Sequence, residues 1–293
     1  MKPRLLVCMS GGRTSAYMAY RILNDPELVA KYEILIVFAN TGAEDEDTLR
    51  FVNECDKRLG FNTVWLEAVV DPRKGKRTGY KVVTYETASR NSEPFIAVVK
   101  KYGIPNTNYL HCTREMKEIP IHGYIWDQGW KKGEYLTAIG MRVDEPKRTK
   151  EKKPDRQTRQ QKVYPLAHWW PTTKEEVLDF WEFMEFDLNI PEHRGNCLYC
   201  HKKSTAKLRR VWQEDPGRFF WPHYMEERFG DVGGNVVPGP RKMYRGYRST
   251  SELIAVFELS GPTDEPVREE PAGSCTEECS PFSGDSDYDD EDI

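Results

Sequence analysis

The 293-residue sequence contains no run of eighteen apolar residues, so no segment is long enough to cross a bilayer as a helix. Its first apolar stretch is short and is followed at once by two glycines, which is unlike the core of a secretory signal. No internal repeat indicates a solenoid. We therefore expect a cytoplasmic protein that does not contact a membrane.

Two common phosphate-binding motifs are also missing. The sequence has no G-x-x-x-x-G-K-[ST] and no G-x-G-x-x-G, which excludes a Walker P-loop and a dinucleotide fingerprint. A disulfide framework is not indicated either, because the seven cysteines are odd in number and unevenly spaced. They fit a reducing compartment with a metal or redox site better. Cys8 and Cys55 lie in apolar segments, where we expect them to fill the core.

The charge of the chain is unevenly distributed. Residues 263–293 contain twelve acidic residues and one arginine, a net charge of −11, so residues 1–262 carry +7 of the total of −4. We expect residues 1–262 to form one folded domain, and residues 263–293, which are rich in Pro, Gly, Ser and acids, to form a disordered acidic tail. A basic folded part favours an anionic ligand such as a nucleotide, a sulfate ester or a nucleic acid.

The first part of the chain alternates between strand-like and helix-like segments. RLLVCM (4–9), EILIVFAN (33–40) and NTVWLEAVV (62–70) are continuous apolar runs that predict buried strands, with helices at about 14–24 and 47–59 between them. This order is typical of an α/β fold with a doubly wound, mostly parallel sheet. Such sheets bind their ligands at the carboxyl ends of the strands.

Later segments extend this pattern and then change it. The sequence predicts helices at 93–103, at 111–130 with an interruption near Pro120, and at 172–186 with a Thr N-cap, and a strand at 134–142. Residues 144–162 contain eight Lys or Arg and almost nothing apolar, so we expect a mobile basic loop that contributes nothing to the core. The C-terminal part of the domain is expected to be helical and to contain cysteines.

The stretch SGGRTS connects the first strand to the first helix. A strand that ends here and restarts as a helix near Thr14 leaves backbone N–H groups directed at whatever lies beyond the helix N-terminus. The two glycines allow close approach, the serines offer hydroxyls and the arginine offers a fork of donors. The candidate anion-binding residues are Ser10, Gly11, Gly12, Arg13, Thr14 and Ser15. A plain strand-to-helix turn is the alternative.

Six segments, taken together and in order, carry a resemblance to a known family. They are SGGRTSAYM (10–18), FANTGAEDEDTLRFV (38–52), HCTREMK (111–117), AIGMRVDEPKR (138–148), YPLAHWWPTTKEEVLDFW (164–181) and GNCLYCHKKS (195–204). The pattern resembles the phosphoadenosine phosphosulfate (PAPS) reductase family of the adenine nucleotide alpha-hydrolase-like superfamily, which also contains the PP-loop ATP pyrophosphatases. It looks most like the versions carried by bacteriophage genomes, and it covers roughly residues 4–220.

This resemblance implies that SGGRTS is a PP-loop holding the phosphate or sulfate end of an adenylyl nucleotide, either PAPS or ATP. It also implies that Thr41 and Gly42 lie beside the nucleotide, and that Gly140, Arg142 and Glu145 form a G-x-R-x-x-E element with Arg142 in a catalytic role. Both segments follow predicted strand ends, where the ligand crevice is expected. A surface salt bridge from Arg142 to a neighbouring acid is the alternative.

The pair in CLYC (197–200) has metal-ligand spacing, although a redox pair has the same spacing. The resemblance adds Cys112 to Cys197 and Cys200 as a third sulfur ligand, with His111 or His201 as a fourth. An iron–sulfur cluster, zinc and no metal all remain open. Sulfonucleotide reductases that carry a cluster have a Cys-Cys pair in addition to the CxxC pair. This sequence departs from that pattern, because His111 stands in place of the first cysteine and Cys112 in place of the second.

Reductases of this family take their nucleophilic thiol from a mobile C-terminal segment with an ECG-type motif. Here Cys279 is the candidate, with Cys275 nearby, but Ser and Pro follow it and the surrounding acids disfavour a thiolate. A tail cysteine without a role is the alternative.

Three functions are compatible with these residues. The first is a sulfonucleotide reductase that releases sulfite with a thioredoxin-like reductant. The second is an ATP-dependent, pyrophosphate-releasing sulfurtransferase acting on a nucleic acid, and the third is a nucleotide-binding protein without turnover. The basic segment 147–162 can close over a nucleotide, follow a nucleic-acid backbone or remain solvated, and the acidic tail can compete with a polyanion for it. The sequence does not indicate an oligomeric state.

Overall fold

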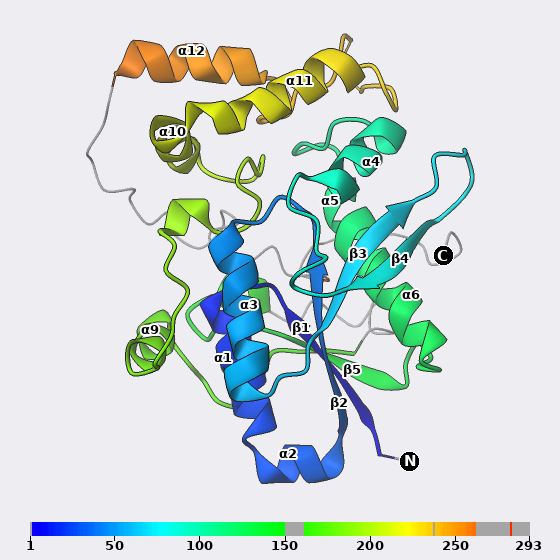
Figure 1. Ribbon diagram of the computed structural model, residues 1–293, viewed down its shortest axis with the longest axis vertical. Coiled ribbons are helices and arrows are strands. Elements are labelled where there is room, and N and C mark those ends of the chain that lie inside the picture. The colour runs from blue at the N-terminus through cyan, green and yellow to red at the C-terminus, as the bar shows by residue number, and fades with distance from the viewer. Residues whose placement is uncertain (1, 150–160, 237, 262–281, 283–293) are drawn as a thin grey trace.

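The computed structural model describes residues 2–149, 161–236, 238–261 and 282 (Figure 1). Its centre is a six-stranded sheet with the strand order β4-β3-β2-β1-β5-β6. Neighbouring strands are parallel except for β3 and β4, which pair antiparallel. The predicted α/β class with a mostly parallel sheet is therefore confirmed. The antiparallel edge strand β4 is a feature that the apolar patterning did not predict.

The strands are β1 (Arg4–Met9), β2 (Glu33–Asn40), β3 (Val64–Val70), β4 (Thr78–Val83), β5 (Tyr135–Ile139) and β6 (Lys162–Val163). The helices up to residue 149 are α1 (Arg13–Leu23), α2 (Pro26–Lys31), α3 (Glu46–Leu59), α4 (Glu93–Tyr102), α5 (His111–Thr113), the π-helix η1 (Arg114–Glu118), α6 (Ile119–Asp127) and α7 (Pro146–Thr149). The later helices are α8 (Pro165–His168), α9 (Lys174–Glu182), the 3-10 helix η3 (Glu192–Arg194), α10 (Thr205–Glu214), the 3-10 helix η4 (Pro216–Phe219), α11 (Phe220–Phe229) and α12 (Thr250–Ser260).

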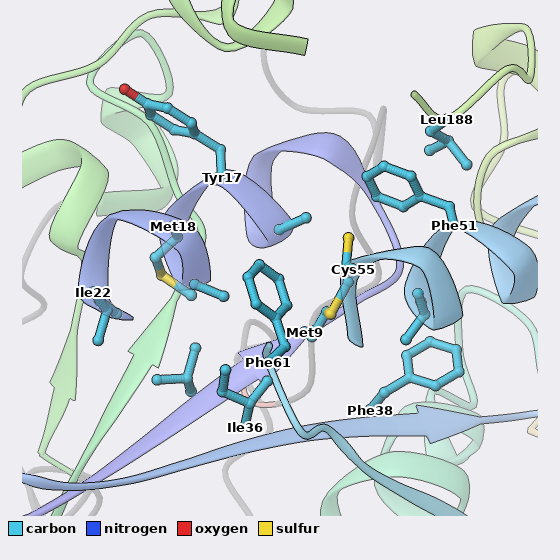
Figure 2. Close-up of a cluster of buried hydrophobic side chains, with 14 of the residues drawn as sticks. Met9, Tyr17, Met18, Ile22, Ile36, Phe38, Phe51, Cys55, Phe61 and Leu188 are labelled. Carbon is cyan, nitrogen blue, oxygen red and sulfur yellow. The ribbon is translucent and has the colours of Figure 1, made fainter. Parts of the chain in front are cut away.

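Helices cover both faces of the sheet, and the alternation of side chains along β1 shows this directly. Val7 and Met9 pack with residues of α1, α3 and α9, whereas Leu6 and Cys8 pack with residues of α6 on the opposite face. Figure 2 shows the first of these clusters, in which Cys55 of α3 lies among the buried side chains of α1 and β2. Cys8 and Cys55 are both fully buried, and burial raises the pKa of both thiols. The two cysteines therefore fill the core, as predicted.

A third apolar cluster joins α4 to the later helices. It contains residues of α10, α11 and α12 together with Cys112, Cys197 and Tyr199. These three helices gather at the top of the molecule in Figure 1, at the end opposite to α2. The prediction of a helical, cysteine-containing C-terminal part is confirmed.

The segment 111–130 forms helical structure, but its irregularity lies before Pro120 rather than at it. Pro120 is the second residue of α6, which directly follows the π-helical turn. The preceding five residues form the π-helix η1, which accommodates one extra residue per turn. Helical structure thus continues from α5 into α6.

The predicted mobile loop 144–162 is ordered at both ends. Pro146–Thr149 forms α7, because the Glu145 carboxylate accepts from the Arg142 N–H and pairs with Arg148. At the other end, Lys162–Val163 adds to the sheet beside β5. Glu145 and Thr149 are buried, so the expectation that this segment contributes nothing to the core is wrong for these residues. Residues 150–160 lie outside the described residues.

One residue of the predicted acidic tail belongs to the core. Phe282 is 3% exposed and stacks on the His122 ring of α6 at a centroid distance of 4.8 Å. Its N–H donates to Glu118 Oε1 at 3.1 Å, and its carbonyl accepts from Lys162 Nζ. The rest of 263–293, including Cys275 and Cys279, lies outside the described residues.

Among the helices that the structure describes, none is both long enough and apolar enough to span a membrane.

Candidate active site

A cavity of about 250 Å³ opens where β1 ends. Residues Ser10 to Thr14 form one wall, and Lys117 and Lys174 also line the cavity. The opposite wall is apolar and comes from α9 and the segment after it: Val177, Leu178, Leu188, Ile190 and Pro191. Glu44, Thr48, Glu192, Gly195 and Asn196 complete the lining. A cavity with an apolar wall and a few polar groups at one end is typical of a nucleotide site.

The glycine turn is braced by its own serines. Ser15 Oγ accepts the Ser10 N–H at 3.1 Å, lies 2.9 Å from Ser10 Oγ and donates to the Gly12 carbonyl at 3.0 Å. Gly11 has a φ of +85°, and a Cβ there would lie 2.6 Å from Thr48 Cγ2. Glycine is therefore required both by the backbone conformation and by the packing of α3.

The first turn of α1 is open to an anion. Its N-cap is Gly12, which offers no capping side chain, and the first turn contains no acidic residue. The N–H groups of that turn and the positive end of the helix dipole thus face the cavity. The anion site that the sequence predicts at these residues stays a prediction.

The guanidinium of Arg13 was expected to donate hydrogen bonds to the anion, but it pairs with Asp187 instead. Its Nε and Nη2 atoms donate to the two carboxylate oxygens of Asp187, each at 2.7 Å, and Nη2 also contacts the Leu188 carbonyl. The guanidinium therefore ties α1 to the segment after α9, which supplies the apolar wall. Its backbone still belongs to the cavity lining.

Arg142 makes the ion pairs that the sequence offers as the alternative to a catalytic role, although its side chain is buried rather than at the surface. It forms ion pairs with Asp144 at 2.9 Å and Glu145 at 3.7 Å, and its Nη1 also donates to Thr14 Oγ1 at 3.2 Å. The side chain is buried, and Gly140 before it is buried directly after β5. The G-x-R-x-x-E element thus holds the first turn of α1 from behind.

The end of β2 links the cavity to the cysteines. Thr41 donates from its N–H and its hydroxyl to the Glu44 carboxylate, at 2.9 and 2.8 Å, and its Oγ1 lies 3.4 Å from Cys197 Sγ. Gly42 has a φ of +76°, and its carbonyl accepts from the Ser92 N–H. Glu44 is therefore held at the cavity by the residue that contacts Cys197.

The three predicted metal ligands meet at a second, smaller space, the thiol cavity, of about 20 Å³. It is lined by Thr41, Phe95, Cys112, Thr113, Met116, Lys117, Cys197, Cys200, His201 and Lys202. Lys117 lines both cavities and is a residue that sequence reasoning missed. It lies on η1, and π-helical turns are frequent at functional sites. A lysine five residues after Cys112, within the quoted segment HCTREMK, is the only signal that marked it.

The expectation of an iron–sulfur cluster at the thiol cavity finds no support in the described residues. Within the described ranges, no group of three or more His, Cys, Asp or Glu side chains is arranged to hold a metal ion. The space of about 20 Å³ suits roughly one water molecule, which is too small for an iron–sulfur cluster. Of the proposed fourth ligands, His111 Nε2 contacts the Gly103 carbonyl at 3.1 Å, while His201 Nε2 is buried without a hydrogen-bond partner. Burial lowers the pKa of His111 to about 4 and of His201 to about 3.

A buried lysine follows the cysteine pair. Lys203 Nζ donates to the carbonyls of His193 and Gly195, the latter at 2.6 Å, which closes the loop that carries Cys197 and Cys200. Burial lowers the pKa of Lys203 to about 8, and the charges of the two cysteines oppose that shift.

Comparisons with known proteins cover different parts of the chain. The model of the phosphoadenosine phosphosulfate reductase domain matches residues 4–189, which contain the glycine turn, Lys117 and Arg142. The nin region protein ORF290 of Escherichia phage lambda is 34% identical over 97% of each chain. The protein MJ0066 of Methanocaldococcus jannaschii is 24% identical over 74% of this chain and 40% of its own length.

Proposed function

Because this chain belongs to the phosphoadenosine phosphosulfate reductase domain family, we propose that it binds an adenylyl sulfonucleotide at the glycine turn and cleaves it reductively with thiols, releasing sulfite. One observation carries the proposal: Lys117 lines both the cavity at the glycine turn and the thiol cavity. A ligand held by its sulfate end at the turn would place that sulfate next to sulfur nucleophiles.

The described residues have distinct roles in this scheme. The amides at Gly11 and Gly12 and the N-terminus of α1 bind the anionic end of the ligand. The apolar wall that includes Val177 and Leu188 receives the adenine base. Lys117 offsets the negative charge that develops on the departing nucleotide phosphate. Arg142 holds Thr14, and through it the first turn of α1, in position.

The reaction exchanges one bond to sulfur for another. A thiolate attacks the sulfuryl sulfur, the bond from that sulfur to the phosphate oxygen breaks, and the nucleotide leaves as its 5'-phosphate. A second thiol then displaces sulfite and forms a disulfide, which a thioredoxin-like dithiol reduces. Cys279, the predicted tail nucleophile, lies outside the described residues and remains a prediction.

The test compares two substrates under matched conditions. Purified full-length protein is incubated with adenosine 5'-phosphosulfate or PAPS plus a dithiol, and sulfite is measured; a parallel reaction contains ATP and a nucleic acid, and pyrophosphate is measured. We expect sulfite, reduced at least about tenfold by Lys117→Met, because one charge-assisted contact stabilises by about 1.5–3 kcal/mol. The exposed Lys100→Met is the matched control. Pyrophosphate without sulfite would instead favour an ATP-dependent sulfurtransferase, and neither product a binding protein without turnover.

A further inference from the structure

The hairpin between β3 and β4 carries positive charge that the proposed function does not use. Residues 71–77 read DPRKGKR, and four of them are exposed cations: Arg73, Lys74, Lys76 and Arg77. Gly75 in the turn has a φ of +75°, and a Cβ added there would meet nothing within 4 Å. The tip of the hairpin therefore lies in open solvent, and Figure 1 shows it projecting from the body of the molecule.

The last turn of α4 brings two more lysines to the hairpin. Lys101 Nζ donates to the Lys76 carbonyl, so the end of α4 lies against the hairpin. Lys100 precedes Lys101 and is exposed. We name these six cations the hairpin cluster: Arg73, Lys74, Lys76, Arg77, Lys100 and Lys101.

The acidic residue of the hairpin offsets little of this charge. Asp71 is paired with Arg73 at 2.5 Å, and the hydrogen bonds from Arg73, aided by the charge of Lys101, lower the pKa of Asp71. Four members of the cluster form no ion pair with any residue that the structure describes: Lys74, Lys76, Arg77 and Lys100. Their charge is therefore balanced by ions from the solvent, which a polyanion can replace.

The hairpin lies at the same edge of the sheet as the glycine turn. β1, β2 and β3 run parallel, and the glycine turn follows the end of β1 at Met9. The hairpin follows the end of β3 at Val70. A macromolecule bound to the hairpin cluster would thus lie at the edge of the sheet that carries the cavity.

The exposure of the cluster favours an extended polyanion over a small one. A small ligand needs a concave site with converging donors, whereas these cations stand on an exposed projection. Apart from Pro72, residues 71–77 have no apolar or aromatic side chain. The tip thus has nothing to insert among acyl chains and no ring to stack on unpaired bases. Duplex nucleic acid, by contrast, presents a phosphate charge about every 1.7 Å along its axis.

We propose that the hairpin cluster binds the phosphate backbone of duplex nucleic acid, an interaction that goes beyond the proposed function. The lysine side chains pair with phosphate oxygens, and the fork of Arg77 does so with two parallel hydrogen bonds. Counterions condensed on the duplex are released, so the affinity falls as the salt concentration rises. Contacts to phosphates carry no sequence information, so binding is independent of the base sequence.

The experiment measures the binding of full-length protein to a fluorescein-labelled DNA duplex of about 20 base pairs, by anisotropy at about 50–200 mM salt. The hairpin variant, Lys74→Gln/Lys76→Gln/Arg77→Gln, changes exposed side chains only. We expect its Kd at about 100 mM salt to be at least about tenfold higher than that of the unaltered protein. The dependence of log K on log salt should become shallower by about 2.7, because each phosphate contact contributes about 0.9. A duplex of unrelated sequence should bind the unaltered protein with the same Kd within about twofold.

The matched control removes the same charge at the opposite edge of the sheet. Lys2 precedes β1, Lys31 ends α2 and Lys57 lies in the last turn of α3, and all three are exposed. The control variant, Lys2→Gln/Lys31→Gln/Lys57→Gln, should bind the duplex with the Kd of the unaltered protein within about twofold.

Two results would overturn this inference: equal affinity of the hairpin variant and the control variant, or no binding of the duplex at about 50 mM salt. Binding of the unaltered protein to vesicles of phosphatidylserine and phosphatidylcholine, but not to the duplex, would assign the cluster to an anionic lipid surface instead. The anisotropy does not involve the sulfonucleotide. Absence of sulfite would therefore overturn the proposed function and leave this inference standing.

Discussion

Arg142 donates a hydrogen bond from Nη1 to Thr14 Oγ1 at 3.2 Å, across 128 positions of sequence. The guanidinium is 7% exposed and is also paired with Asp144 and Glu145. It therefore joins the loop after β5 to the helix N-terminus that faces the cavity. We therefore expect the orientation of the N–H groups in the first turn of α1 to depend on this contact.

Arg142→Lys retains the positive charge but removes the planar fork that makes these contacts together. We expect the Kd for adenosine 5'-phosphosulfate, measured by calorimetry, to rise at least about tenfold, since one charge-assisted hydrogen bond contributes about 1.5–3 kcal/mol. Arg50→Lys, at a half-exposed pair with Asp47, is the control and should bind normally. Equal affinity of Arg142→Lys and the unaltered protein would show that the residue serves only its own loop.

Gly11→Ala tests the turn itself. The alanine must adopt a φ of +85° and also place its Cβ 2.6 Å from Thr48 Cγ2, so we expect a loss of nucleotide binding and a lower thermal midpoint. Gly60→Ala has a similar φ of +67° with nothing within 4 Å, so it measures the conformational penalty alone, about 1–2 kcal/mol. The difference between the two variants is the cost of the collision.

Thr48→Ser removes the atom that a Cβ at residue 11 would meet. We expect Gly11→Ala/Thr48→Ser to recover part of the stability that Gly11→Ala loses, measured by urea denaturation. If Gly11→Ala were no less stable than Gly60→Ala, packing against α3 would not be what requires glycine at this turn.

Sequence reasoning predicted the parts of the fold that are determined by residues close together in the sequence. β1 and β2 are mostly apolar runs, and their bounds agree with the prediction, because burial on both faces leaves few polar positions in such strands. β4 was not predicted, because four of its six residues are not buried and its pattern is that of an exposed edge. The turn at Gly11 was found because glycines between a strand and a helix form a short-range signal.

The site was less predictable, because its geometry depends on contacts between distant residues. Arg13 was expected to serve an anion, but its fork is taken by Asp187, 174 residues away. Lys117 could not be assigned before the two cavities were known to adjoin. Phe282 is flanked in the sequence by small and acidic residues. No repeating pattern of apolar residues around it predicts that its side chain is buried.

His122 makes the stability of the protein dependent on pH. Its ring is buried between Trp126 and Phe282, and burial, aided by the charges of Lys132 and Lys162, lowers its pKa to about 4. The unfolded chain takes up the proton below about pH 6.5, whereas the folded protein does so only near pH 4. Stability is therefore lost as the pH falls from 6.5 to 4, by up to about 1.4 kcal/mol per pH unit.

His122→Phe retains the aromatic stack and removes the titration. We expect its free energy of unfolding, from urea titrations at pH 6.5 and pH 4.5, to fall less than that of the unaltered protein. His223→Phe, at a partly exposed position with partners Ser251 and Glu227, should follow the unaltered protein. An identical fall in His122→Phe would assign the acid sensitivity to other groups.

Phe282 is held against α6 and β6. The ring stacks on His122, the N–H donates to Glu118 and the carbonyl accepts from Lys162, so the ring and both backbone polar groups have partners. Burial of a phenylalanine side chain stabilises by about 1.5–3 kcal/mol, and Phe282→Ala removes this contribution. Because the change affects a local anchor, we expect the released population to grow about tenfold or more while the thermal midpoint of the domain changes little.

Arg268 provides the measurement for this prediction, since it is the one basic residue among residues 263–293. We expect trypsin to cleave after Arg268 several-fold faster in Phe282→Ala under native conditions, because the variant loses the contacts of Phe282 with α6 and β6. Phe183→Ala is the matched control, because Phe183 is 89% exposed and anchors nothing. Equal cleavage rates in the two variants would contradict the anchor, because cleavage would then be limited by a segment that Phe282 does not restrain.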